Sequence, residues 1–338
     1  MDRDNLSLAV PSNSELHEPT LRFFESCNIA ISRPSSRRYT AEIPALPGAA
    51  VVFQRSADIT SKIDEGSADL GVVGLERYYE SRMEDGDTIV LVENMGYGQC
   101  ELVIAVPDSW IDVSSVADLA DLSAQMREQG RELRVCTKYN RLVKQFFYSK
   151  GLNYFCLVDA SGALEAAPAM GYADIIVDIT ATGVTLRENR LKTLTDGVIV
   201  RSQACLVGNR RLLKQSALKL DITRRILEMI EARRQAGGYY SITANIRGSS
   251  EDAVAKHVTA RPEIAGIQGP TIAKVFGKRG SEGNWYAVTL VIEKARLIEA
   301  VEHLRGIGGS GITVASPNYM FGATCQSYQK LLAELDKA

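Results

Sequence analysis

The residues with the clearest chemical potential lie in one stretch, residues 165–186. Residues 175–177 (Ile-Ile-Val) predict a buried strand, and Asp178 stands at its C-terminal end, where open α/β sheets bind their ligands. The small residues 180–183 (Thr-Ala-Thr-Gly) then predict a tight loop in which backbone N–H groups can approach an anion. A short helix expected from Thr185 offers its N-terminus to a phosphate. The stretch therefore predicts a cradle for a phosphate group.

Two carboxylates extend this expectation from a phosphate to a sugar phosphate. Asp178 can accept hydrogen bonds from vicinal sugar hydroxyls, and Glu165 lies one helix and one strand upstream, where it can face the same pocket. The hydroxyls of Thr182 and Thr185 can add further hydrogen bonds. The alternative is purely structural: a helix after an edge strand, with Thr182 or Thr185 as its cap.

The elements that position this stretch alternate along the first two-thirds of the chain. Short apolar runs alternate with helix-like segments, which indicates βαβ units and largely parallel sheets with helices on both faces. The expected strands include residues 6–10, 69–74, 102–106, 133–136, 155–158 and 175–177. A long helix expected over residues 218–232 ends at basic residues followed by Gly237 and Gly238, which indicates a domain boundary.

The remaining hundred or so residues have a different pattern. Strands are expected over residues 240–246, 271–276, 285–292 and 312–315, with helices over residues 251–258 and 295–305. This order is βαββαβ, the ferredoxin-like motif. The fold hosts many functions, so the order alone assigns none.

Composition limits the classes of protein that fit. A chain of 338 residues suggests two or three domains, and a net charge of -2 argues against a general nucleic-acid binder. No apolar run approaches the roughly 20 residues that span a bilayer, and the charged N-terminus lacks a signal peptide's pattern. We therefore expect a cytoplasmic protein, or a plastid protein if a transit peptide has been removed. Six cysteines without a Cys-x-x-Cys pair indicate core packing, and three widely separated histidines argue against a zinc site.

Residues 165–186 also resemble the signature of ATP phosphoribosyltransferases. That pattern is Glu, five residues, Gly, any, a small residue, two residues, Ile or Val, any, Asp, an aliphatic residue, two residues, Ser or Thr, Gly, any, Thr, then Leu or Met. Every defined position is met from Glu165 to Leu186. The resemblance extends to residues 8–11, 55–59, 66–74, 133–139, 269–272 and 308–312. The last two of these segments resemble the tail found in the long form of the family.

The resemblance implies the first step of histidine biosynthesis. N1 of the ATP adenine displaces pyrophosphate from C1 of phosphoribosyl pyrophosphate (PRPP), with Mg²⁺ held mainly through the pyrophosphate, so no metal-ligating residue is named. Such a reaction needs positioning and charge stabilisation more than a nucleophilic side chain. The implied partners are ATP, PRPP and L-histidine as a feedback inhibitor. A homo-oligomer, a hexamer of dimers, is also implied, without nucleic acid or membrane.

The resemblance implies an α/β fold in three parts. Two periplasmic-binding-protein-like α/β domains form a cleft, and a ferredoxin-like (βαββαβ, ACT-like) regulatory domain follows. The expected boundaries are residues 1–100 and 190–215 for catalytic domain I, 101–189 for catalytic domain II with the PRPP loop, 216–238 for a linking helix and 239–338 for the regulatory domain.

The matching motifs also carry over site residues. The PRPP residues are Glu165, Asp178, Thr180, Ala181, Thr182, Gly183, Val184 and Thr185. The ATP or pyrophosphate residues are Arg55, Gly74, Glu76, Tyr97, Glu101 and Lys138. The histidine-site residues are Asn245, Thr271, Ser310 and Gly311. Structural alternatives stay open: Arg55 in a surface ion pair, Glu101 in solvent, and a C-terminal domain that only joins subunits.

One segment departs from the family pattern. The family usually follows its first strand with a turn that carries Lys and Gly near the ATP phosphates, whereas this chain has Ser12-Asn13-Ser14-Glu15. Exchanging a cation for a carboxylate beside a polyphosphate weakens binding, because charge-assisted hydrogen bonds are the strong ones there. Either other cations serve, or the protein accepts another base or is inactive. The candidate cations are Arg22, Arg37, Arg38 and Lys138.

Two further classes compete with the enzyme. One is a phosphoribosyltransferase-like paralogue that acts as a small-molecule binding protein, which the two-lobed layout also suits. The other is a non-catalytic regulatory subunit, although this chain carries its own C-terminal tail. Formation of pyrophosphate from ATP, PRPP and Mg²⁺ separates these classes.

Overall fold

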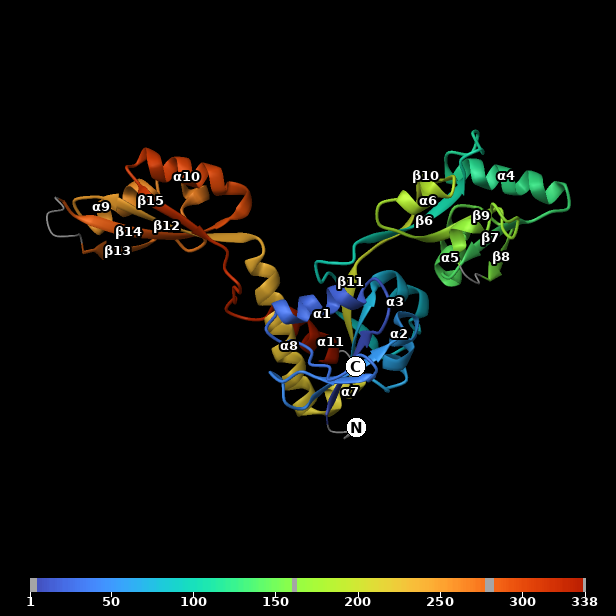
Figure 1. Cartoon of the computed structure of the whole chain (residues 1–338), viewed down its shortest axis with the longest axis horizontal. Coiled ribbons are helices and arrows are strands. Elements are labelled where there is room, and N and C mark those ends of the chain that lie inside the picture. The colour runs from blue at the N-terminus through green and yellow to red at the C-terminus, as the bar shows by residue number, and fades with distance from the viewer. Residues whose placement is uncertain (1–4, 160–162, 277–282, 337–338) are drawn as a thin grey trace. The chain divides into compact units, whose positions relative to one another are not determined.

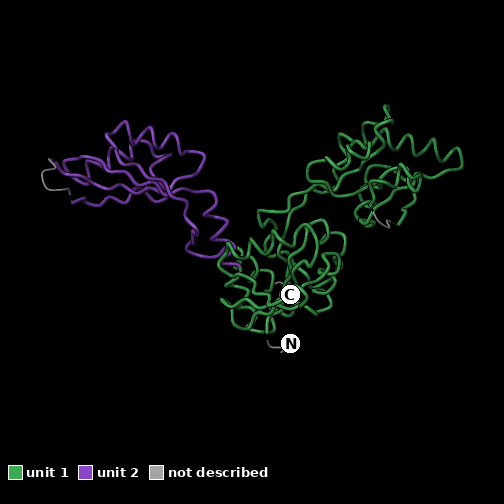
Figure 2. Tube along the Cα trace, viewed as in Figure 1, with its two compact units in different colours: residues 1–226, 327–338 green, residues 227–326 purple. Residues whose placement is uncertain are grey.

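The computed structural model describes residues 5–159, 163–276 and 283–336. The chain divides into two compact units, residues 1–226 with 327–338 and residues 227–326, which Figure 2 shows in green and purple. A six-stranded and a five-stranded sheet lie in the first unit, and a four-stranded sheet lies in the second. None of the described helices is both long and apolar enough to cross a bilayer.

The first sheet has the order β2-β3-β1-β4-β11-β5. Its strands are β1 (Leu6–Pro11), β2 (Thr40–Glu42), β3 (Ala49–Gln54), β4 (Leu70–Gly74), β5 (Thr88–Val92) and β11 (Ala204–Asn209). Its helices are α1 (His17–Ser26), α2 (Ser56–Asp64), α3 (Leu75–Ser81), α7 (Arg210–Gln215) and the beginning of α8 (Ala217–Ala236). Ala9 and Val73 pack against Ile59 and Ile63 of α2 in one buried cluster. Figure 1 shows α2 and α3 to one side of this sheet and α1 to the other.

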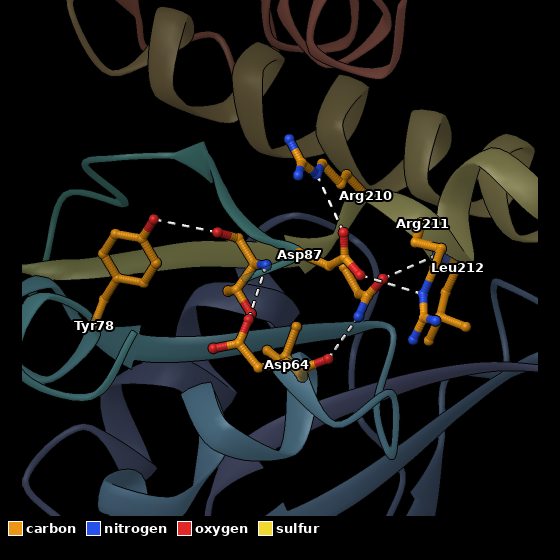
Figure 3. Close-up of polar contacts among 9 residues, drawn as sticks. Asp64, Tyr78, Asp87, Arg210, Arg211 and Leu212 are labelled. Atoms are coloured by element: carbon orange, nitrogen blue, oxygen red, sulfur yellow. Dashed lines mark hydrogen bonds and ion pairs between the residues drawn. The ribbon is translucent and has the colours of Figure 1, made fainter. Parts of the chain in front are cut away.

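A polar network ties the end of β11 to the start of β5 (Figure 3). The Asp87 carboxylate pairs with Arg210 Nε at 3.2 Å and also pairs with the next arginine of α7. The Asp64 carboxylate, at the end of α2, accepts the backbone N–H of Thr88 at 3.0 Å. Asn209 caps α7 by accepting the backbone N–H of Leu212. These contacts fix one end of the first sheet. The strand that precedes the predicted phosphate loop belongs to the second sheet.

The second sheet has the order β10-β6-β9-β7-β8. Its strands are β6 (Cys100–Pro107), β7 (Leu133–Thr137), β8 (Phe155–Asp159), β9 (Ile175–Thr180) and β10 (Leu191–Ser202). Its helices are α4 (Val116–Glu128), α5 (Asn140–Ser149), the short 3-10 helix η1 (Leu164–Ala166) and α6 (Val184–Glu188). Side chains alternate along β6, because Leu102 and Ile104 pack toward α4 and α5 while Val103 and Ala105 pack toward η1 and α6. Both faces of this sheet are therefore covered.

The first two sheets are mixed rather than largely parallel, which corrects the expectation from the alternating pattern. In the second sheet β7, β8, β9 and β10 run in the same direction, and β6, which pairs with β9 and β10, is antiparallel to both. The chain passes from the first sheet to the second after β5 and returns after β10, and β6, the first strand formed after the passage, runs against both of its neighbours. Doubly buried strands read as continuous apolar runs whichever way they point, so the sequence pattern carries no direction. Residues 191–202 of the range expected in domain I thereby pair within the second sheet.

The second unit contains the expected βαββαβ order. Its elements are β12 (Tyr239–Arg247), α9 (Glu251–Val258), the 3-10 helix η2 (Pro262–Ile264), β13 (Thr271–Val275), β14 (Trp285–Glu293), the 3-10 helix η3 (Lys294–Arg296), α10 (Leu297–Gly306) and β15 (Ser310–Ala315). The sheet order is β13-β14-β12-β15 and every pair is antiparallel. Ile242, Val288 and Leu290 pack against Val254 of α9 and Leu304 of α10. The last helix, α11 (Gln326–Asp336), takes the chain back into the first unit.

Candidate active site

The predicted phosphate loop follows a buried strand and precedes a helix, as expected. Ile175, Ile176 and Val177 of β9 are fully buried, and the loop leads into α6. Gly183 has φ of +69°, in the left-handed region that favours glycine, and its N–H donates to Thr180 Oγ1 at 2.9 Å. The loop is thus closed by its own first threonine, and its small residues leave its outer side open.

A cavity of about 300 Å³ lies against this loop. It is lined by Glu15, Cys100, Glu165, Asp178, Ile179, Thr180, Ala181, Thr182, Val184, Thr185 and Leu186. Seven of the eight residues expected to bind PRPP therefore line one cavity, and the remaining one, Gly183, lies within the loop itself. The structure brings this predicted group together, while its ligand stays a prediction.

Asp178 is the most perturbed acid of this cavity. Burial raises its pKa, and the Glu165 carboxylate raises the pKa further. The N–H of Ile179, which donates to Asp178 Oδ1 at 2.8 Å, and the positive charges of Lys138 and Arg77 lower it. Asp178 thus has neighbours that raise its pKa and neighbours that lower it. A carboxyl group in this position, near the end of a strand, is well placed to bind hydroxyl groups.

Glu15 faces the same cavity from the first sheet's side of the unit. It lines the cavity with Cys100, whose pKa is raised to about 11, first by burial and then by the nearby carboxylates of Glu76, Glu15 and Glu101. The turn before Glu15 is held by backbone and hydroxyl contacts, including Ser14 Oγ to Ser56 Oγ at 2.9 Å. The departure from the family pattern thus places a carboxylate opposite the phosphate loop.

The residues expected for ATP or pyrophosphate do not line this cavity. Arg55 is exposed at the N-terminus of α2. Gly74 ends β4, where an added Cβ would overlap the Glu76 carboxylate and require that side chain to move. Glu76 itself is buried and accepts a hydrogen bond from the Ser202 hydroxyl at 2.5 Å. Glu76 therefore forms a polar contact between α3 and Ser202 at the end of β10.

The other three residues of that group have partners of their own or stand in solvent. The Tyr97 hydroxyl lies 2.9 Å from Thr20 Oγ1 of α1, and burial raises the tyrosine's pKa. Glu101 forms an ion pair with Arg201 at 3.0 Å across the β6 and β10 pair. Lys138 is exposed directly after β7, and its charge acts on Asp178. Of the three, Lys138 is the one that the structure connects to the cavity.

Sequence reasoning missed two residues near this site. The Arg77 guanidinium stacks over the Tyr139 ring at 4.1 Å and, like Lys138, acts on Asp178. The available signal was that Arg77 directly follows Glu76, in a helix that comes after a strand ending in glycine. Cys100, expected in a hydrophobic core, instead lines the cavity wall.

Three of the four residues expected to bind histidine lie together in the second unit. Asn245 of β12 is paired with Ser310 of β15, whose hydroxyl donates to the Asn245 carbonyl at 3.4 Å. A Cβ on Gly311 would lie 3.5 Å from Asn245 Nδ2. Thr271 lies on β13, which β14 separates from β12, so it stands apart from the other three. Histidine binding at this place stays a prediction.

The sequence is similar to known proteins along nearly its whole length. A family model described as ATP phosphoribosyltransferase matches residues 55–232, and one described as HisG, C-terminal domain, matches residues 236–317. ATP phosphoribosyltransferase 2, chloroplastic, of Arabidopsis thaliana is 37% identical over 337 residues, which cover 98% of this chain and 81% of that protein. An ATP phosphoribosyltransferase of Nitrobacter winogradskyi is 36% identical over 329 residues, 97% of each chain.

A solved structure shares the fold of about two-thirds of the chain. A chain of the ATP phosphoribosyl transferase (HisG:HisZ) complex from Thermotoga maritima has a TM-score of 0.52 and 24% identity, and it covers 67% of this chain and 98% of that chain. The matched family models span both units, and the similarity to the plant and bacterial relatives runs through nearly the whole sequence. The chain therefore belongs to the ATP phosphoribosyltransferase family, in the long form that carries the HisG C-terminal domain.

Proposed function

We propose that this chain transfers the 5-phosphoribosyl group of PRPP to N1 of the adenine of ATP and releases pyrophosphate. The observation that carries the proposal is the cavity in which the phosphate loop meets Asp178 and Glu165. A loop of backbone amides and hydroxyls suits the 5-phosphate, and two carboxylates suit the ribose hydroxyls. This arrangement supports a ribosyl phosphate as the ligand over an amino acid or a bare nucleobase.

Each part of the cavity then has a task in the displacement. The backbone of residues 181–184 and the hydroxyls of Thr182 and Thr185 hold the 5-phosphate, so C1 of the ribose is fixed relative to the incoming base. Positive charge develops on the ribose ring as the bond to pyrophosphate breaks, and the carboxylates of Asp178 and Glu165 stabilise it. Lys138 and Arg77 are the cations whose charges lower the pKa of Asp178, and they suit the leaving pyrophosphate.

A magnesium ion fits this site as a companion of the substrate. The cavity presents three carboxylates, Glu15, Glu165 and Asp178, and Mg²⁺ favours one or two carboxylates together with phosphate oxygens. Among the residues that the structure describes, no cluster of three or more acidic, cysteine or histidine side chains is arranged to hold a metal ion. The ion would therefore come with PRPP, and when bound it neutralises charge on the pyrophosphate oxygens.

Regulation and assembly complete the proposal. Feedback inhibition by histidine would act through Asn245, Ser310 and Gly311, which lie together on neighbouring strands. Allostery of this kind requires two states that histidine binds unequally. A hexamer of dimers is proposed as the assembly, to be measured by sedimentation with and without histidine. The proposed location is the cytoplasm, or a plastid, as the name of the Arabidopsis relative gives for that protein.

Glu15 supports a second candidate function. A carboxylate that faces the phosphate loop opposes a polyphosphate unless a cation lies between them. A paralogue that accepts a less charged base, or that binds a ribosyl phosphate without turnover, would tolerate Glu15. Pyrophosphate release with another purine base, but not with ATP, would identify this second function.

Pyrophosphate release from ATP, PRPP and Mg²⁺ tests the main proposal. We expect the wild-type chain to release pyrophosphate and Asp178→Asn to lose at least about tenfold in kcat/KM, since one transition-state interaction is removed. Asp112→Asn removes the same charge from an exposed position of the same sheet's surroundings and serves as the matched control. No release from the wild-type protein with either ATP or another purine would overturn the assignment as an enzyme.

A further inference from the structure

Helix α3 joins the two sheets of the first unit through its side chains. It directly follows β4 of the first sheet, and its Tyr79 packs against buried clusters of both sheets. By the bounds of the described strands, the chain passes between these two sheets through residues 93–99 and again at Gln203. Contacts from α3 therefore supply a third connection between the first sheet and the second.

The main such contact is a helix cap made by Glu80. Helix α5 of the second sheet begins after Tyr139, which makes no side-chain cap, and α5 has no acidic residue in its first turn. The Glu80 carboxylate accepts the backbone N–H of Arg141 at 2.9 Å with one oxygen and that of Leu142 at 3.0 Å with the other. Both amides are among those that a helix leaves unsatisfied at its N-terminus, where a negative charge is also favourable.

Two further contacts hold the same corner. The Arg77 guanidinium stacks over the Tyr139 ring at 4.1 Å and donates to the Lys138 carbonyl at 3.3 Å. Arg141 donates to the Arg82 carbonyl at 2.5 Å, just beyond the end of α3, and to Glu84. The segment between β7 and α5, which carries Lys138, is therefore fixed by α3 and not by its own helix alone.

This corner adjoins the cavity. Thr137 of β7 pairs with Val177 of β9, so Lys138 directly follows the strand position next to Asp178, which lines the cavity. Arg77 contacts the Lys138 carbonyl and the Tyr139 ring, and the charges of both cations lower the pKa of Asp178. If the cap were absent, the N-terminus of α5 and the preceding Lys138 would lose two of their anchors to α3. The relative placement of both cations at Asp178 depends on that contact.

We propose that Glu80 is a positioning residue: by capping α5 from α3, it sets Lys138 and Arg77 beside Asp178 for the pyrophosphate half of the phosphoribosyl donor. This inference rests on the proposed function, because it assigns the two cations to that donor. A cap that only stabilises the fold is the competing explanation, and the two differ in what they do to the reaction.

Glu80→Ala and Glu80→Gln test the proposal against the matched control Glu84→Gln. Glu84 carries the same charge and contacts the same Arg141, but its side chain is 80% exposed and does not accept from α5 backbone N–H groups. We expect both Glu80 variants to lower kcat/KM for PRPP by about 10- to 100-fold, as for misplaced substrate-binding groups, with Glu84→Gln within about twofold of wild type. Glu80→Asp, with a shorter carboxylate, should restore part of the loss.

Hydrogen exchange at Arg141 and Leu142 provides an arm that does not depend on the reaction. Loss of the cap should speed exchange of these amides by about 5- to 30-fold, the factor equivalent to a lost helix cap. Calorimetric binding of Mg²⁺ and PRPP should weaken in the same variants. Should Glu80→Ala fail to fold, Glu80→Gln, which keeps one acceptor oxygen, gives the same comparison.

Each outcome decides between the explanations. Faster exchange with unchanged PRPP affinity and unchanged kcat/KM means that the cap is structural and overturns the positioning role. Unchanged exchange means that the cap is absent in solution and overturns it as well. A wild-type chain that binds PRPP but forms no product from ATP contradicts the proposed function, while exchange and PRPP calorimetry still decide the role of Glu80.

Discussion

Gly183→Ala offers the sharpest test of the phosphate loop. Gly183 has φ of +69°, and a residue with a Cβ pays roughly 1–2 kcal/mol in that left-handed conformation. The added Cβ would also lie 3.2 Å from Arg187 Nη1, but that atom ends a flexible side chain and can move. The backbone penalty therefore dominates. A small loop relieves such strain by leaving the left-handed region, which breaks the Gly183 N–H bond to Thr180.

The backbone penalty lowers the affinity for PRPP, because binding must restore the left-handed conformation at residue 183. A cost of about 1–2 kcal/mol corresponds to about 5- to 30-fold weaker PRPP binding. The assay is pyrophosphate release with PRPP varied at saturating ATP, together with calorimetric binding of Mg²⁺ and PRPP. We expect a higher KM and dissociation constant for PRPP, with a smaller effect on KM for ATP.

Gly130→Ala is the matched control for this prediction. Gly130 has φ of +78° with no atom within 4 Å of an added Cβ, and it follows α4 in the same sheet's surroundings, away from the cavity. It should show a similar backbone penalty as a lower Tm, with the KM for PRPP unchanged. Gly183→Asn should bind better than Gly183→Ala, because asparagine tolerates the left-handed region. Equal PRPP affinity of Gly183→Ala and wild type would refute the reasoning.

Three further predictions follow from the same structure. Glu15→Lys restores a cation opposite the phosphate loop and should lower the KM for ATP by about tenfold, as steady-state kinetics would show, whereas an unchanged KM would remove Glu15 from the substrate's surroundings. Burial raises the pKa of Asp178 above its ordinary value of 3.8, so the protonated acid favours folding and this contribution is lost as pH rises through the folded pKa. The Tm gain of Asp178→Asn over wild type should therefore grow as pH rises above 3.8, and a gain that shrinks with pH would contradict the sign. Asn245→Ala should weaken histidine binding in calorimetry of the full chain and Thr271→Ala should not, since β14 separates Thr271 from the other three residues; equal losses would place the site elsewhere.

The phosphate loop was predictable because its chemistry is local. A buried apolar run, an acid at its end and a small-residue turn fix β9, the loop and α6 without reference to distant parts of the chain. The same holds for the βαββαβ order of the second unit, whose central strands β12 and β14 alternate in burial. In both cases the sequence pattern and the structure depend on neighbours in the chain.

Features that depend on long-range pairing were not predictable in this way. The antiparallel direction of β6 and the place of β11 between β4 and β5 come from the chain's path between two sheets. Arg77 and Glu80 gain their roles from contacts some 60 residues away in sequence, with Lys138 and Arg141. An arginine or a glutamate on a short helix carries no mark of such a partner.

The place of β11 has a consequence for synthesis on the ribosome. In the first sheet β11 lies between β4 and β5. One edge of each of these two strands therefore stays without its hydrogen-bonding partner until the whole second sheet has been translated. The second sheet is formed by one continuous segment, from β6 to β10, so all of its strands have been synthesised before β11. A nascent chain that ends at Gln203 would thus expose two unpaired apolar edges, the situation in which strands pair with other chains. Arrest at that point should favour aggregation, and release of the next few residues should end it.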